Sequence, residues 1–357
     1  MNSLRQIMNA CLFSSAAISV GAEHSVAIDA ATRKEVVEGA IRQMNERYVF
    51  PDVAKKTEAA LYRNLQDKRY DDLDDAGRFA AKLTEDLQAV SKDKHIRVRY
   101  SATPLPKTQS NTASTEQISK YRKQAEIENY GIEKVERLTL NIGYIDLRGF
   151  ISVDISGEAI SAAMTLVANT DALIIDLRQN GCGSPATVAF MTSYLFDERT
   201  HLNSLYWREG NRTSQFWTQD FVPGKRFGQK KPVYVLTSKR TFSGAEEFAY
   251  NLKNLKRATI VGESTGSGAH PGSMRRIAAH FEMFVPSGRA ISPITNTNWE
   301  GTGVEPDIKV ASDDALRTAQ ILALKKILEG EKDEGYAKRL QKRMTELEAE
   351  APTTTIK

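Results

Sequence analysis

The chain has 357 residues and a formal net charge of +4, with 49 Lys and Arg residues mixed among 45 Asp and Glu residues. This balance excludes the strongly basic surface of a nucleic-acid-binding protein. Two cysteines exclude a disulfide framework, and their spacing suggests no metal site. The length is enough for about two domains.

The first 22 residues have the pattern of a secretory signal peptide. Arg5 supplies a positive charge, residues 7–20 are mostly apolar and small, and Ala22 ends a small-residue cleavage pattern. The apolar stretch is too short for a membrane span, and no later stretch qualifies as one. We therefore expect a secreted or periplasmic protein that is cleaved near Ala22. A lipoprotein processing site at Cys11 is the alternative.

Residues 23–100 are expected to form a helical bundle that ends in a strand. Residues 30–90 repeat apolar side chains with the period of three amphipathic helices, and Asp74 or Asp75 can cap the third. Residues 101–130 are polar, with a run rich in Ser, Thr and Gln, and are expected to be a linker.

One histidine stands out at the end of the predicted bundle. Residues 95–100 alternate as a strand, which places His95 at the junction between helix and strand. Imidazole is the usual general base at neutral pH. His270, in a glycine-rich loop, is the rival base, and an ordinary surface or hydrogen-bonded histidine is the alternative interpretation of His95.

Residues 131–312 are expected to form an α/β domain. Residues 142–147 and 172–178 have the pattern of strands, the second apolar enough to be buried on both faces. A glycine-containing turn, residues 179–185, then leads into a helix. This turn is no phosphate-binding loop, because the Gly-Lys-Ser/Thr ending is missing.

The same order of strand, turn and helix recurs at Ser243. Residues 233–236 predict a buried strand, and apolar spacing from Gly244 onwards predicts a helix. Ser243 is therefore expected at a helix N-terminus, beside free backbone N–H groups and where negative charge is favoured, as an acyl-transfer nucleophile requires. The alternative is that Ser243 is only an N-cap.

Right-handed βαβ packing would set these two turns side by side. The backbone N–H groups of Gly183 and Gly244 would then form an oxyanion hole. An ordinary tight turn is the alternative at Gly183. Further along, residues 281–289 suggest a hairpin, and residues 313–357 are expected to hold one charged amphipathic helix followed by a tail.

Five stretches together resemble the family of C-terminal processing (tail-specific) and tricorn-core serine peptidases, and look closest to its branch related to interphotoreceptor retinoid-binding protein. They occur in family order: DKHIRV (93–98), IGYIDL (142–147), DLRQNGCGSP (176–185), residues 237–272 and NWEGTGVEPD (298–307). The resemblance implies an α/β fold, a crotonase-like (ClpP/crotonase) ββα-spiral core preceded by an N-terminal helical bundle.

The resemblance also implies site residues. Ser243 corresponds to the family's nucleophile. Tail-specific members carry a lysine base in the glycine loop, where this chain has Gly268, so the Ser–Lys arrangement is lost. The tricorn-like version uses a histidine and a glutamate, whose motif positions hold His95 and Glu300. The resemblance implies that Glu300 holds the catalytic site through a polar link either to Ser243 or to His95. Cys182 stands where glycine is common, which weakens the Gly183 donor, and no PDZ-like module is visible.

The expected activity is hydrolysis of peptides or protein C-termini through an acyl-enzyme on Ser243, with His95 as general base and no metal or cofactor. The alternative is a non-catalytic carrier of apolar ligands such as retinoids or fatty acids, because the retinoid-binding relative carries lipids on the same scaffold. The presence of Ser243, His95 and Glu300 together favours the enzyme.

Overall fold

The computed structural model describes residues 26–107 and 114–350, so the predicted signal peptide, with Cys11 and Ala22, and the tail lie outside the described residues. The chain divides into two compact units. Among the described residues, the helical unit comprises 26–107, 204–214 and 268–291, and the sheet unit comprises 114–203, 215–267 and 292–350. Each unit is described by itself.

The helical unit contains the three predicted helices. They are α2 (Ala30–Arg47), α3 (Pro51–Gln66) and α4 (Ala76–Ser91). The N-cap of α4 is Asp75, whose carboxylate accepts a hydrogen bond from Arg78 N at 2.6 Å. The bundle is therefore confirmed, because apolar periodicity and caps are local signals.

A three-stranded antiparallel sheet completes the core of this unit. Its order is β1 (Arg97–Tyr100), β10 (Phe281–Pro286), β9 (Gly272–Ala278). Gly39 of α2 packs so closely on β9 that a Cβ there would lie 2.0 Å from the carbonyl oxygen of Ile277. The expected division of the chain at residues 101–130 therefore left the later strands out of this unit. These strands belong to it because they cover the apolar faces of its helices.

The expected hairpin at residues 281–289 is wrong. Strand β10 pairs with β9 and β1, whereas β11 (Gly288–Ile291) pairs with β5 (His201–Trp207). Strand β6 (Arg212–Trp217) follows β5 in that sheet, and the intervening turn contains η2 (Glu209–Asn211). Alternating strand residues do not specify their partner strand, which explains the error.

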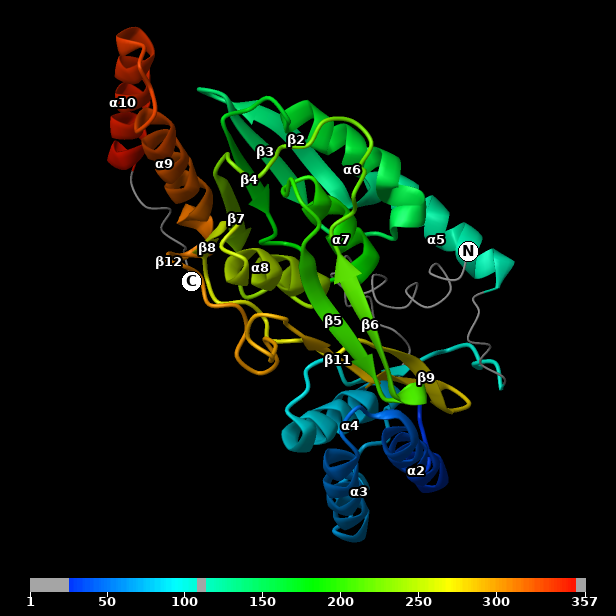
Figure 1. Cartoon of the computed structure of the whole chain (residues 1–357). Coiled ribbons are helices and arrows are strands. Elements are labelled where there is room, and N and C mark those ends of the chain that lie inside the picture. Colours follow the sequence, from blue (N-terminus) through cyan, green and yellow to red (C-terminus); the bar gives the residue numbers. More distant parts are fainter. Residues whose placement is uncertain (1–25, 108–113, 351–357) are drawn as a thin grey trace. The chain divides into compact units, whose positions relative to one another are not determined.

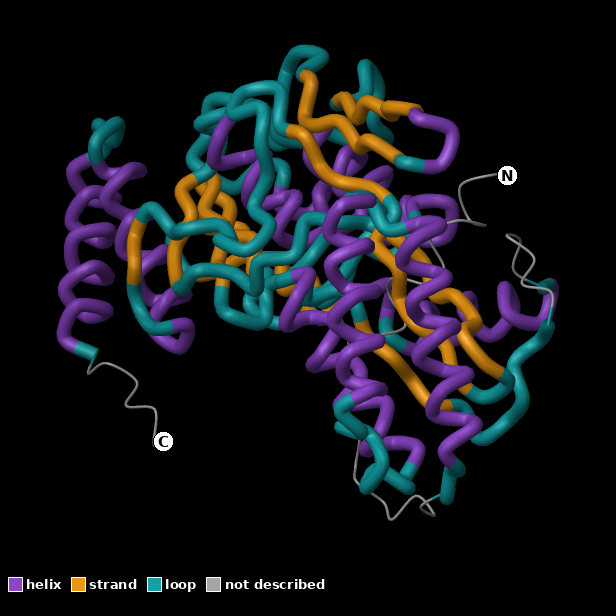
Figure 2. Tube along the Cα trace, turned by 90° about the horizontal axis from the view of Figure 1, so that it is seen from below, coloured by secondary structure: helices purple, strands orange, loops and turns teal. Residues whose placement is uncertain are grey.

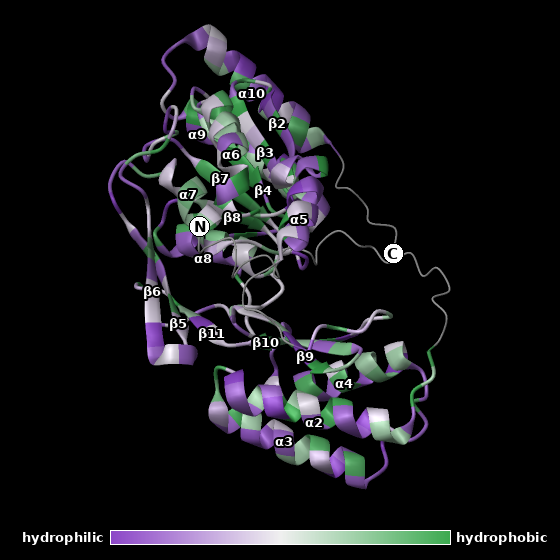
Figure 3. Cartoon of the chain, turned by 90° about the vertical axis from the view of Figure 1, so that its right-hand side faces the viewer, coloured by the Kyte–Doolittle hydropathy of each residue, from purple (hydrophilic) through white to green (hydrophobic). Residues whose placement is uncertain are grey.

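The sheet unit has a mixed six-stranded sheet (Figure 1). Only the pair β2–β3 is antiparallel, and the other pairs are parallel. In spatial order the strands are β12 (Ile308–Lys309), β8 (Thr259–Gly262), β7 (Val233–Thr237), β4 (Ala172–Asp176), β3 (Ile142–Leu147) and β2 (Ile132–Leu138). Apolar residues, green in Figure 3, concentrate on the central strands, which are buried on both faces.

Helices cover this sheet. Three of them follow strands of the sheet: α6 (Val153–Val167), α7 (Pro185–Ser193) and α8 (Gly244–Asn254). Helix α9 (Ala315–Leu328) packs on β4, β7 and β8, and α10 (Glu334–Ala349) lies beside α9 (Figure 2). The predicted single C-terminal helix is thus two helices, which separate near Gly330. A short helix, η3 (Ser312–Asp314), precedes α9.

A further helix occupies the predicted linker. Helix α5 (Thr115–Ile127) begins with a capping box in which Ser114 Oγ accepts from Gln117 N and Ser114 N donates to Gln117 Oε1. The polar composition of this segment concealed the cap. Helix η1 (Asn129–Gly131) then leads into β2.

Candidate active site

Ser243 lies in the tight turn between β7 and α8, as predicted. Its backbone has φ 58° and ψ −119°, a conformation that a residue with a side chain rarely adopts. Such a conformation costs about 1–3 kcal/mol and is typically found at functional sites. Two hydrogen bonds hold it: Ser243 N donates to Glu246 Oε2 at 2.8 Å, and Ser243 O accepts from Glu247 N at 2.9 Å.

The turn of Ser243 is bound to the turn that follows β4. Phe242 N donates to Asn180 O at 3.0 Å, and Thr241 Oγ1 donates to Leu177 O at 2.8 Å. The two strand–turn–helix segments therefore lie side by side, as the sequence predicted.

Gly183 and Gly244 lie at the contact between these turns. A Cβ on Gly244 would lie 2.8 Å from Gly183 Cα, so only glycine permits this approach. Phe150 holds the other side of Gly183, because Phe150 N donates to Cys182 O at 3.2 Å and Phe150 O accepts from Ser184 N at 2.8 Å. Within the described residues, neither the Gly183 nor the Gly244 N–H donates a hydrogen bond. Both donors are thus available to a ligand.

Glu246 is a site residue that the sequence analysis did not single out. Its side chain is fully buried, one turn into α8. Besides the Ser243 N–H, its carboxylate accepts hydrogen bonds from Thr265 Oγ1 and from Ser267 N, the latter at 2.7 Å. Glu246 therefore joins the turn of Ser243 to the glycine-rich loop after β8. Its position three residues after Ser243 is the feature of the sequence that could have identified Glu246 as a site residue.

Glu300 lies in the same unit as Ser243. Gly301 N donates to Ser267 O at 3.2 Å. The loop carrying Glu300 is therefore hydrogen-bonded to Ser267, whose N–H donates to Glu246. Glu300 N donates to Asn298 Oδ1 at 2.9 Å. Ser243, Gly183, Gly244 and Glu300 therefore belong to one unit and one connected set of loops.

His95 lies in the helical unit, at the predicted junction between α4 and β1. It packs close to Asp93, a buried residue that the sequence analysis did not single out. His95 N donates to Asp93 Oδ1 at 3.0 Å, and His95 Nδ1 lies 3.7 Å from the same oxygen. The imidazole ring stacks on Phe284.

His270 is bound to the other oxygen of Asp93. The distance from His270 Nδ1 to Asp93 Oδ2 is 2.8 Å, and Tyr48 donates its hydroxyl hydrogen to the same oxygen at 3.2 Å. Because an ionised carboxylate only accepts hydrogen bonds, His270 Nδ1 is the donor in this contact. This is the arrangement of a base oriented by a carboxylate.

Asp93 is ionised in this setting. Burial alone would raise the pKa of its carboxyl, but the hydrogen bond from His270, the close approach of the His95 ring and the positive charge that either ring gains on protonation hold the pKa well below its usual value of 3.8. The helical unit thus contains a buried carboxylate that is ionised at neutral pH, beside two imidazole rings.

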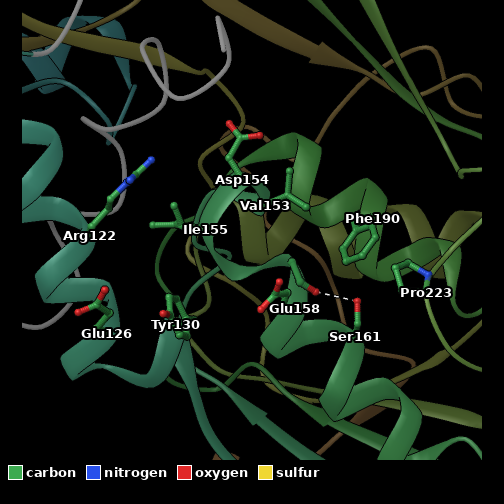
Figure 4. Close-up of a pocket in the computed structure, with 11 residues that line it drawn as sticks. Arg122, Glu126, Tyr130, Val153, Asp154, Ile155, Glu158, Ser161, Phe190 and Pro223 are labelled. Atoms are coloured by element: carbon green, nitrogen blue, oxygen red, sulfur yellow. Dashed lines mark hydrogen bonds between the residues drawn. The ribbon is translucent and has the colours of Figure 1, made fainter. Parts of the chain in front are cut away.

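A separate groove of about 690 Å³ lies in the sheet unit (Figure 4). Arg122 and Glu126 of α5 face Asp154 and Glu158 of α6 across it. None of the predicted site residues lines this groove, so it is not the place of the proposed chemistry.

The comparisons with known proteins identify the family. A model described as peptidase family S41 matches residues 141–310. A second, described as the N-terminal domain of peptidase S41 in eukaryotic IRBP, matches residues 23–135. The chain belongs to peptidase family S41. The family predicted from the five motifs is therefore confirmed, and the alternative of a non-catalytic carrier gains no support.

Carboxyl-terminal-processing peptidase 1, chloroplastic, of Arabidopsis thaliana is a relative of this S41 chain. The two are 26% identical over 182 residues, which are 51% of this chain and 36% of the relative. The match thus spans about a third of the relative's length.

Two solved structures have a similar fold. A candidate peptidase of Parabacteroides merdae matches with a TM-score of 0.57 at 19% identity, over 82% of this chain and 96% of the other. A lipoprotein of Streptococcus agalactiae matches with a TM-score of 0.51 at 14% identity, over the same shares. These similarities support the mixed α/β fold with N-terminal helices. Among the helices of residues 26–107 and 114–350, none is long and apolar enough to cross a lipid bilayer.

Proposed function

We propose that this S41 protein is a serine peptidase that hydrolyses peptides or protein C-termini through an acyl-enzyme on Ser243. The observation that carries the proposal is the strained turn of Ser243, beside the N–H groups of Gly183 and Gly244, which donate no hydrogen bond within the part of the chain that the structure describes. A serine held in a strained turn between strand and helix presents its hydroxyl to a substrate.

In the proposed reaction, Ser243 Oγ attacks the scissile carbonyl carbon while a histidine accepts the hydroxyl proton. The Gly183 and Gly244 N–H groups stabilise the negative charge on the carbonyl oxygen. The histidine then gives the proton to the leaving amine, and water hydrolyses the acyl-enzyme with the same residue as base. The step uses no metal or cofactor.

His95 is the proposed general base, supplied by the helical unit, on the strength of its motif position. His270 is the second candidate, because its ring is oriented by the 2.8 Å hydrogen bond from Nδ1 to Asp93. In both versions Asp93 orients the base and stabilises the imidazolium ion. Glu300 is proposed to support the site through the loops that hold Ser243.

Two further proposals concern the fold and the location of the protein. We propose that the sheet unit has a crotonase-like ββα-spiral core, which its repeated strand–turn–helix segments support. We also propose export to the periplasm or the cell exterior after cleavage near Ala22, supported by the pattern of residues 1–22. The mass of the protein purified from its producing cell tests the export, since an uncleaved N-terminus would contradict it.

The experiment for the peptidase is labelling by a fluorophosphonate probe, which reacts with activated serines. The wild type is compared with Ser243→Ala, His95→Ala, His270→Ala and the control His201→Ala. We expect labelling to be lost in Ser243→Ala and to persist in the control His201→Ala. Loss of labelling in either His95→Ala or His270→Ala identifies the base. Absence of labelling in the folded wild type would overturn the proposal.

A further inference from the structure

Three polar side chains are buried together in the sheet unit without satisfied hydrogen bonds. Glu247 and Asn251 lie one turn apart on the same side of α8, and Asn203 on β5 faces the Glu247 carboxyl. Their exposed fractions are 4%, 2% and 1%. Glu247 Oε1 and both side-chain polar atoms of each asparagine have no hydrogen-bond partner among the described residues.

Polar atoms buried in this way normally bond to something, because leaving them without partners is costly. Buried water is the usual solution where several polar groups converge, since one water makes about three hydrogen bonds. A carboxyl and two amides provide both donors and acceptors for such water.

The carboxyl of Glu247 is mostly protonated at neutral pH. Burial raises its pKa to about 8 from 4.5, although the Asn203 side chain acts in the opposite direction. No charged group contributes to the shift. Helix α7 and strand β8, which pack against α8, carry no ionisable side chain.

The other ionisable groups of α8 and β5 bond elsewhere. Glu246 accepts from the glycine-rich loop, Tyr250 bonds to Thr295, and Lys253 pairs with Asp307. On β5, the His201 ring bonds to the Asn203 carbonyl oxygen, and the Tyr206 ring lies against the Arg289 guanidinium group. Glu247 therefore titrates without a charged partner.

Glu247 is directly bonded to the backbone of the proposed nucleophile. Its N–H donates to Ser243 O at 2.9 Å, while the neighbouring Glu246 holds the Ser243 N–H. Both residues thus form hydrogen bonds with the backbone of the strained Ser243. Anchoring the Glu247 side chain also anchors the first turn of α8.

We propose that Glu247 is a positioning residue that acts with a protonated carboxyl, joined through buried water to Asn203 and Asn251, and so holds Ser243 in its strained turn. This inference rests on the proposed function. Ionisation of Glu247 places an uncompensated negative charge within a turn of the oxyanion site, where it opposes the charge that develops on the substrate. The reaction is therefore expected to slow as Glu247 ionises.

The test compares labelling rates of the full-length protein with the fluorophosphonate probe from about pH 5 to about pH 10. Glu247→Gln keeps the shape and donor of the protonated acid but cannot ionise. Glu247→Met removes the polar group at similar length. Glu348→Gln, on the exposed surface of α10, is the control for loss of one carboxylate.

Wild type and Glu348→Gln are expected to slow above about pH 8, whereas Glu247→Gln keeps its rate there and equals the wild type at pH 7. Glu247→Met should be labelled about 10- to 100-fold more slowly than Glu247→Gln at every pH, because Ser243 is misplaced. The proposal is overturned if Glu247→Gln is as slow as Glu247→Met, if Glu247→Met matches the wild type, or if the wild type shows no alkaline decline.

A second measurement separates this inference from the proposed function. Infrared spectroscopy of the folded protein at pH 7 should show the carbonyl band of a buried protonated carboxyl, absent in Glu247→Gln. If the band is present but the wild type is not labelled, the peptidase proposal fails and the protonation stands. If the band is absent from a wild type that is labelled, the inference about Glu247 fails alone.

Discussion

The peptide backbones of Gly183 and Gly244 are in contact: a methyl group on Gly244 would lie 2.8 Å from the Cα atom of Gly183. Each glycine begins or precedes a helix that follows a parallel strand, and neither N–H group donates a hydrogen bond to residues 26–107 or 114–350. Two turns distant in sequence thus present two donors at one place.

Gly244→Ala is expected to reduce labelling of Ser243 by about 10²- to 10³-fold, because the new methyl group forces the two donors apart. Circular dichroism should show that the variant is folded. The matched control is Gly330→Ala, between α9 and α10, where a Cβ has its nearest neighbour at 3.9 Å. Equal labelling of the two variants would remove Gly244 from the oxyanion hole.

Glu246→Gln is expected to lower the free energy of unfolding by about 1–3 kcal/mol and to slow labelling. The amide nitrogen that replaces one oxygen cannot accept a hydrogen bond, so at least one of the donors Ser243 N, Thr265 Oγ1 and Ser267 N loses its partner. Urea unfolding measures the stability. A variant as stable and as reactive as the wild type would show that this carboxylate does not hold the loops together.

Asp93→Asn is expected to change the dependence of stability on pH in acid. The pKa of Asp93 is lower in the folded than in the unfolded state, so its stabilisation is present above about pH 4 and is lost as the pH falls through the folded pKa. The variant should be less stable at pH 7 by about 2–3 kcal/mol and lose less on acidification. Asp72→Asn, at an exposed position, is the control. Urea unfolding at several pH values makes the comparison, and parallel curves for wild type and Asp93→Asn would contradict the ionised buried carboxylate.

The contribution of Glu247 to stability changes with pH in the opposite direction. Its pKa is about 8 in the folded state and 4.5 in the reference state, so the folded state binds one more proton between these values. Stability from this group therefore falls as the pH rises from about 4.5 to about 8. Glu247→Gln should lack this decline, and thermal unfolding across that range measures it. An identical decline in both proteins would assign it to other groups.

Local patterns predicted the elements that carry Ser243 and His95. The apolar strand, the short turn and the amphipathic start of α8 are contained within residues 233–255, so propensity and periodicity suffice there. The two glycine turns were also placed together correctly, because parallel strands with helical crossovers bring their turns to one edge of the sheet.

Contacts between distant segments could not be predicted from the sequence. Asp93 and His270 are separated by half of the chain, and the alternation of β1 and β10 gives no indication that these strands pair. The role of Glu246 was hidden for a similar reason, because Thr265 and Ser267 reach it only in the folded unit. His270 could be named as a rival base, but not as the partner of Asp93.

Chain order also constrains how the helical unit can form. Helices α2 to α4 are made first, yet the strands β9 and β10 that cover their apolar faces come about half a chain later. During synthesis, the apolar faces of the early helices remain uncovered until these strands are made. Closing so long a loop slows the packing of the strands on the helices. A nascent or truncated chain that ends before Gly272 therefore cannot complete its N-terminal core, and the apolar surface that stays exposed favours aggregation.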